Sequence, residues 1–442
     1  MLSERVKTIF RLALPIIAGM CSQNILNTVD TAFVGSLGQT ALGAVGIGGI
    51  ATWLCLSSLI GLSTAVQAYA ARRIGEGLTH RAAVGLKVAL MLAIGLGSVL
   101  AVAGWFGASQ VFAWMVDDVA VQQVGTEYLQ VRLAAAPFSV CIFAFSGFYN
   151  GIGQSRRYLA VLVIMHSSNV LLDWMLIFGN LGAPALGATG AGLATSLSQV
   201  IGFFVYVAMV VRDGRSYGFF TESLTHTDAK NVVKVALPSS LQQGTYSAGF
   251  LTIFAIAAAI GTQAVALSHV LVNLMLLCVL PGVGFGIAGA TLVGQALGRG
   301  DRQQALSWGR DIIRIGVVIM IGLGLILALG GRTWLSIFLR SEPELIEAGI
   351  VPLMIIGLSQ GLDSIGVMYK QMMMRSGDTA AIFRISTTIQ WGLFLPVLWI
   401  SCTQLGGDVL TLWALLMGWR LLDSSAMILR WRSGRWVEAA QI

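Results

Sequence analysis

Long apolar segments separated by short polar connections dominate the pattern of this chain. Apolar runs of about 20 residues or more with few charges predict helices that span a bilayer. Twelve such segments follow one another, at 10–34, 42–68, 84–106, 124–148, 158–179, 188–211, 232–260, 265–294, 310–330, 346–371, 382–402 and 408–430. The pattern therefore predicts an all-α polytopic membrane protein with twelve transmembrane helices.

Composition and charge agree with a membrane location. The 442 residues are 56% hydrophobic and only 11% charged, whereas soluble domains carry roughly 25% charged residues. The net charge of +7 suggests nucleic acid at first, but 24 of the 27 basic residues, with Arg420 counted at the C-terminus, fall in alternate connections and near the two termini, whereas Arg132 lies inside the fourth apolar segment. By the positive-inside rule this predicts a multi-pass inner (plasma) membrane protein with both termini cytoplasmic and no nucleic-acid partner.

An internal repeat relates the two halves of the chain. Residues 13–82 align without a gap to 236–305 at an offset of 223, and Ala13-Leu14-Pro15 matches Ala236-Leu237-Pro238. Six helices in each half give the halves parallel topology, as in transporters that rock two bundles around a shared cavity. We therefore expect an N-lobe at 1–211 with helices 1–6, a cytoplasmic linker at 212–231 and a C-lobe at 232–442 with helices 7–12.

Two aspartates inside apolar helices are the first candidates for chemistry. Asp30 has Asn27 and Gln23 on the same helical face, and Asp173 has Asn169 and His166 behind it in the same way. A carboxylate at membrane depth costs roughly 2.5–3.5 kcal/mol on insertion scales, so it needs a partner or a function. These stripes predict an ion or proton site, in which the two acids would titrate as a coupled pair. The alternative is a hydrogen bond that only locks the two helices together.

Three sequence motifs point to a family. The helix-one opening Ala13-Leu14-Pro15, the segment Val29–Gly38 (VDTAFVGSLG) and the segment Leu292–Asp301 (LVGQALGRGD) resemble the multidrug and toxic compound extrusion (MATE) family. The resemblance covers essentially the whole chain. Its N-lobe is most similar to the DinF-like branch, through the VDT motif with Asp30, the NxxxD motif of Asn169 and Asp173, and the GAxLAT motif at 190–195 that ends at Thr195.

The resemblance implies a fold and a site. It implies the MATE fold, with twelve transmembrane helices in two pseudo-symmetric six-helix lobes, and a proline, Pro15, at which helix one bends. It places the coupling site for H⁺, or for Na⁺ held by oxygen ligands, at Asp30, Asn169, Asp173 and Thr195. A second branch of the family has a helix-seven glutamate in the C-lobe, but helix seven here offers Gln242, Gln243 and Tyr246 instead. Asp363 alone matches an acid seen in parts of the family.

Other polar residues within the apolar helices are candidates for a substrate cavity, although bonds between helices explain them equally well. They are Gln23, Asn27, His166, Gln242, Tyr246, His269, Asn273 and Asp363. Tryptophans near helix ends are typical of interfacial anchors. In this sequence they are Trp334, Trp399, Trp413, Trp431 and Trp436.

The favoured function is secondary active multidrug efflux. We expect an antiporter, a monomer in the lipid bilayer, that exports amphipathic or cationic organic compounds in exchange for H⁺ or Na⁺ and needs no other cofactor. The alternative is a flippase for lipids or lipid-linked oligosaccharides, which shares the wider fold. An enzyme is not expected, because no nucleophile, base and metal cluster occurs at a common depth.

Overall fold

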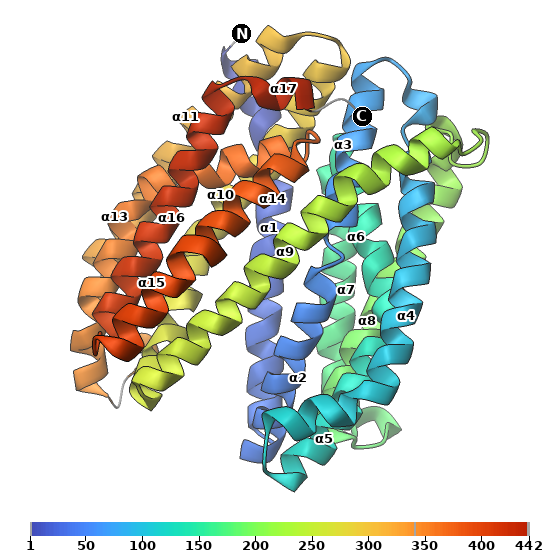
Figure 1. The fold of residues 1–442 in the computed structure, drawn as a ribbon. Coiled ribbons are helices and arrows are strands. Elements are labelled where there is room, and N and C mark those ends of the chain that lie inside the picture. The colour runs from blue at the N-terminus through green and yellow to red at the C-terminus, as the bar shows by residue number, and fades with distance from the viewer. Residues whose placement is uncertain (1, 340–341, 440–442) are drawn as a thin grey trace. The chain divides into compact units, whose positions relative to one another are not determined.

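Every regular element in the described residues is a helix (Figure 1). The computed structural model describes residues 2–339 and 342–439. These form two compact units by their internal contacts. The N-terminal unit is Ala18–Ser240, and the C-terminal unit is the remainder of the described chain.

The helices follow the predicted order with additional breaks. The first half of the chain contains α1 (Leu2–Gly35), α2 (Gln39–Ser57), α3 (Gly61–Gly75), η1 (Thr79–Arg81), α4 (Val84–Met115), α5 (Val119–Ala134), α6 (Ala136–Gly151), α7 (Ser155–Phe178), η2 (Asn180–Gly182), α8 (Gly187–Asp213) and η3 (Gly214–Tyr217). The second half contains α9 (His226–Ile260), α10 (Thr262–Gly298), α11 (Arg302–Leu329), α12 (Gly331–Phe338), α13 (Pro343–Met374), α14 (Thr379–Thr387), the π-helical η4 (Thr388–Phe394), α15 (Leu395–Trp399), the π-helical η5 (Ile400–Gln404), α16 (Val409–Arg432) and α17 (Arg435–Ala439).

The described chain contains eleven helical segments long and apolar enough to cross a membrane. The bent pair α5 and α6, which meet at 47°, supplies a twelfth when it is counted as one span. This confirms the twelve-helix prediction but corrects the fourth helix, which we expected to be continuous over 124–148. Pro137 lies at the start of α6, and because proline cannot donate the backbone hydrogen bond of a helix interior, the break falls just before it.

Helices α1 and α9 each contribute to both units. The first turns of α1 pack in the C-terminal unit, where Phe10 meets Phe285 edge to face at 5.9 Å and Arg5 forms a 2.7 Å ion pair with Asp311. The start of α9, as far as Ser240, in turn belongs to the N-terminal unit. The compact units therefore differ at these two helices from the lobes expected at 1–211 and 232–442.

The predicted linker at 212–231 packs on the N-terminal unit. The backbone carbonyl of Tyr217 accepts a 2.9 Å hydrogen bond from the amide of Ala83, and its hydroxyl accepts one of 2.7 Å from Gln154. Asp228 accepts hydrogen bonds of 2.6 Å from Tyr69 and 3.1 Å from Arg81. These bonds anchor the predicted linker to α3, to η1 and to the connection between α6 and α7.

Glycine allows the closest helix contacts. A Cβ on Gly147 of α6 would collide with the backbone carbonyl of Ser63 in α3, and one on Gly357 of α13 would collide with the carbonyl of Gly324 in α11. Helices in a membrane gain stability from this close approach, because apolar side chains gain little by leaving lipid.

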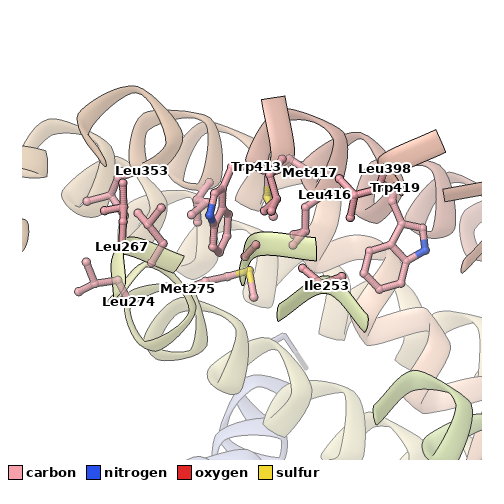
Figure 2. Close-up of a cluster of buried hydrophobic side chains, with 14 of the residues drawn as sticks. Ile253, Leu267, Leu274, Met275, Leu353, Leu398, Trp413, Leu416, Met417 and Trp419 are labelled. Carbon is pink, nitrogen blue, oxygen red and sulfur yellow. The ribbon is translucent and has the colours of Figure 1, made fainter. Parts of the chain in front are cut away.

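The C-terminal unit has a large apolar core (Figure 2). Trp413 of α16 is 1% exposed, and its indole N–H donates a 3.2 Å hydrogen bond to Ser268 of α10. Trp431 and Trp436 are also buried and stack at 4.3 Å. The expectation that these three tryptophans anchor the membrane interface is wrong, because position near a helix end does not reveal which face a neighbouring helix covers.

Candidate functional site

An apolar cluster joins α1, α7 and α8 in the N-terminal unit. It contains Val34 of α1, Ile177 of α7 and Ala191 of α8, each at most 4% exposed. Beside it, Phe33 and Phe178 meet edge to face at 5.7 Å. Successive spans alternate in direction, so α1 and α7 run in parallel and α8 returns beside α7.

The polar residues of the predicted site lie one helical turn from this cluster. Asp30 precedes Val34 by four residues, Asp173 precedes Ile177 by four, and Thr195 follows Ala191 by four. Because α8 runs antiparallel to α1 and α7, all three residues lie one turn from the apolar cluster on the same side of it. The fold thus brings the three predicted residues to one level of the bundle.

The two carboxyl groups face each other. The side chains of Asp30 and Asp173 lie within hydrogen-bonding distance of one another, and Asp173 is 0% exposed. Both oxygens of Asp173 and one oxygen of Asp30 are buried without a partner in the described residues. Two ionised carboxylates have no hydrogen to donate, so the pair can form its hydrogen bond only when one of them carries a proton.

Asn169 and Thr195 differ in their hydrogen bonding. Asn169 is 0% exposed, and neither its amide nitrogen nor its amide oxygen has a partner in the described residues. Thr195 instead donates a 3.0 Å hydrogen bond to the carbonyl of Ala191 in its own helix. Asn169 is therefore free to bond an ion or the acid pair, whereas the hydroxyl hydrogen of Thr195 is used locally.

Sequence reasoning missed two residues of α5 that border the acid pair, Arg132 and Tyr128. Arg132 lies near enough to act electrostatically on both carboxyl groups and on Tyr128. Its Nε and Nη1 atoms are buried without a hydrogen-bond partner in the described chain. The sequence did carry the signal, since an arginine inside an apolar helix is as unusual as an aspartate there.

The contacts between α5 and α8 place Arg132 at the level of the acids. Ser196 of α8 donates a 3.0 Å hydrogen bond to the carbonyl of Val131, which immediately precedes Arg132. One turn away, the ring of Tyr128 packs against Gly192 so closely that a Cβ there would lie 2.9 Å from it.

A chain of hydrogen bonds connects α1 and α7 near the acid pair. One ring nitrogen of His166 lies 3.1 Å from the hydroxyl of Ser22, and the other lies 3.1 Å from the side-chain oxygen of Gln23. Gln23 in turn donates a 3.1 Å hydrogen bond to Asn27. Three predicted cavity residues thus form one network with an exposed end, as Gln23 and Asn27 are largely accessible.

In the C-terminal unit, Asp363 of α13 is fully paired. It accepts hydrogen bonds of 2.5 and 3.2 Å from Arg420 of α16 and one of 3.2 Å from Ser424. Asp363 and Arg420 are 2% and 7% exposed. We counted Arg420 among the cytoplasmic basic residues of the C-terminus, and the structure corrects this, because its guanidinium is buried within the bundle.

The remaining predicted cavity residues of the C-terminal unit are divided. Tyr246 lies near enough to Arg420 and Asp363 to interact with them electrostatically and so belongs to the Asp363 cluster. Gln242 is buried one turn before it. Asn273 donates a 2.9 Å hydrogen bond to the carbonyl of His269, whose ring lies 4.9 Å from that of Phe254. In the described residues no hydrogen bond links this pair to Asp363.

Known proteins resemble this chain over almost its full length. The probable multidrug resistance protein NorM of Thermotoga maritima is 26% identical over 439 residues, which covers 98% of this chain and 94% of that protein. The multidrug resistance protein MdtK of Edwardsiella ictaluri is 25% identical and covers 89% of this chain and 87% of its own length. The DinF-like assignment of the N-lobe motifs is not tested by these relatives and stays a prediction.

Solved structures and a family model agree on the fold. A MOP superfamily transporter from Pyrococcus furiosus superposes with a TM-score of 0.88 at 23% identity, covering 99% of this chain and 97% of that chain. A multidrug resistance MATE family transporter in an outward-facing conformation gives a TM-score of 0.88 at 22% identity with the same coverage. The model of the MatE family matches residues 15–175 and 238–400. The chain therefore belongs to the MatE family of membrane transporters and has the twelve-helix MATE fold.

Proposed function

We propose that this transporter is a secondary active antiporter that exports amphipathic organic cations in exchange for H⁺, or for Na⁺ at the same place, loaded at Asp30 and Asp173. The names of the relatives, multidrug resistance proteins NorM and MdtK, support the multidrug substrates. Membership of a transporter family also means that the chain is not an enzyme.

One observation carries the coupling site. The oxygens of the Asp173 carboxyl are fully buried and have no partner in the described residues, although a second carboxyl lies beside them. Intramembrane acids are costly, and a structural pair would be expected to satisfy its oxygens. An acid pair that lacks a donor is instead suited to take up and release a monovalent cation.

Coupling follows from differential affinity. An ion shifts a conformational equilibrium only as far as it binds one conformation more tightly than the other. Asp30 is carried by α1, and Pro15 interrupts the backbone hydrogen bonds of that helix, so neutralising Asp30 can favour a different bend of α1. In the conformation that has released its cation, the ionised pair would attract an organic cation.

The test is gradient-driven efflux of a dye cation from proteoliposomes. We would load ethidium and impose a pH gradient or a Na⁺ gradient separately, comparing the wild type with Asp30→Asn, which keeps the shape of the side chain and removes its charge. We expect efflux driven by the pH gradient, and efflux at the level of empty liposomes for the variant.

Three results would change the proposal. Efflux that responds only to the Na⁺ gradient would make the acid pair a Na⁺ site. Unimpaired efflux by Asp30→Asn, with the variant verified as folded by size-exclusion chromatography, would remove Asp30 from the mechanism. No efflux by the wild type under either gradient would contradict export of organic cations and favour a lipid substrate.

A further inference from the structure

The site in the N-terminal unit contains a cation of its own. Arg132 shares its level with Asp30 and Asp173, through the contacts of α5 with α8 described above. Arginine stays protonated in proteins, so its charge is a permanent part of the site. Two of its guanidinium nitrogens, Nε and Nη1, are buried and have no hydrogen-bond partner among the described residues.

The charges at this level can be counted. The two carboxylates contribute two negative charges and Arg132 contributes one positive charge. Tyr128 is neutral at ordinary pH. Of the other ionisable groups on the packed helices, Glu127 of α5 accepts a hydrogen bond from Thr189 at the start of α8, and His166 of α7 is held by Ser22 and Gln23.

The empty site thus carries one net negative charge, which a single monovalent cation neutralises. A second cation would leave a net positive charge beside a buried guanidinium, where the low dielectric makes like charges expensive. We propose that Arg132 is a resident counter-ion that limits the site to one monovalent cation per transport cycle, so that exchange against a singly charged organic cation is electroneutral.

This inference rests on the proposed function but goes beyond it, since it concerns the number of coupling ions and not their identity. It also assigns a specificity role to a residue that does not itself bind the coupling ion. Arg132 lies near enough to act electrostatically on both carboxyl groups, yet its Nε and Nη1 atoms and both oxygens of Asp173 have no hydrogen-bond partner in the described residues. The carboxyl oxygens therefore stay available to the exchanged cation.

The experiment measures whether a membrane potential drives transport. Proteoliposomes would hold a fixed pH gradient (or a Na⁺ gradient, if that ion drives efflux), with a tenfold K⁺ gradient and valinomycin imposing the potential. We expect the steady-state ethidium gradient of the wild type to be unchanged by valinomycin. For Arg132→Gln, two cations exchanged for one dye cation move one net charge, so the gradient should change about tenfold.

Arg132→Lys is the matched control, because it keeps the positive charge and should remain insensitive to the potential. A potential-sensitive wild type would overturn the inference, and so would an active Arg132→Gln variant that stays insensitive. Neither result touches the proposed function, which is tested separately by gradient-driven efflux of the wild type and of Asp30→Asn.

A second measurement covers an Arg132→Gln variant that binds but does not transport. Tetraphenylphosphonium would be added to the detergent-solubilised protein in weak buffer, with a pH indicator to count the protons released. The wild type should release one proton per bound cation, and Arg132→Gln should release more than one. Equal counts for both proteins, or a count of two for the wild type, would contradict the role of Arg132.

Discussion

The two units differ in the hydrogen-bond partners that surround a buried aspartate. In the N-terminal unit, Asp173 has no partner for either carboxyl oxygen in the described residues, and its neighbour is another acid. In the C-terminal unit, Asp363 receives two hydrogen bonds from Arg420 and a third from Ser424. In the first arrangement the carboxyl oxygens of Asp173 have no hydrogen bond within the described residues, so they could accept a cation. In the second, the oxygens of Asp363 are already hydrogen-bonded to Arg420 and Ser424. Burial of an acid alone therefore does not indicate a coupling site, because its hydrogen-bond partners decide whether the carboxyl group can accept a cation.

The difference appears already in the repeat. The offset of 223 that aligns the two halves places Ile253 opposite Asp30. Ile253 is 4% exposed and packs in the apolar core shown in Figure 2. The same helical position thus holds an acid in one unit and a residue of the apolar core in the other. The two halves thus share an aligned sequence repeat but differ in where their buried charges lie.

The sharpest test of this contrast is a matched pair of substitutions, Asp363→Asn and Asp173→Asn. Asp363→Asn leaves the buried guanidinium of Arg420 without its counter-charge, and breaking such a pair destabilises a protein by about 3–5 kcal/mol. Asp173→Asn removes a charge that has no counter-ion bonded to it, so it should leave stability unchanged or raised while abolishing gradient-driven efflux. Thermal unfolding in detergent and ethidium efflux from proteoliposomes measure the two effects.

The double variant Asp363→Leu with Arg420→Met provides the control. Replacing both members of a buried ion pair by apolar residues is often neutral or stabilising, so this variant should regain most of the lost stability. If Asp363→Asn proved stable but inactive, the acid in the C-terminal unit would also couple transport, and the contrast between the units would fail.

The repeat offers a second test of nearly the same size. Ile253→Asp places in the C-terminal unit the acid that Asp30 supplies in the N-terminal unit. The surrounding residues are apolar, and an unpaired acid at membrane depth costs roughly 2.5–3.5 kcal/mol. We expect a loss of that order in unfolding experiments, compared with less than about 1.5 kcal/mol for the volume-conserving Ile253→Leu. A stable Ile253→Asp protein would show that this region hosts a charge as readily as the N-terminal unit does.

The acids of the N-terminal unit can be picked out from the sequence for a physical reason. Asp30, Asn169 and Asp173 interrupt apolar helices at helical spacing, and the cost of a polar group in lipid makes each of them conspicuous. Their meeting at one level could be expected only from the resemblance to the MATE family, because spacing along one helix does not say which helices touch.

The residues that sequence reasoning misjudged depend on contacts between helices. The sequence shows Arg132 as a charge inside the fourth apolar segment, but nothing in the pattern connects it with the acids on α1 and α7. The sequence groups Arg420 with the basic C-terminus, because its partner Asp363 lies 57 residues away on another helix. Pairing of this kind is decided by packing and leaves no periodic trace in the chain.

Thr195 provides the smallest and most discriminating test. The resemblance places it among the coupling residues, but its hydroxyl donates to the carbonyl of Ala191 in the same helix. Only the lone pairs of the hydroxyl oxygen remain for an ion, and a proton shared between two carboxyl groups does not need them. We therefore expect Thr195→Val to keep pH-driven ethidium efflux within about twofold and stability within about 1 kcal/mol, the net worth of a typical hydrogen bond.

Thr195→Ser, which keeps the hydroxyl, is the control for shape. A Na⁺ site would behave differently, because loss of one oxygen ligand from a hard cation weakens its binding. A Thr195→Val variant that lost efflux while Thr195→Ser retained it would thus place the hydroxyl in the coordination of a cation, and would argue against a proton shared by Asp30 and Asp173.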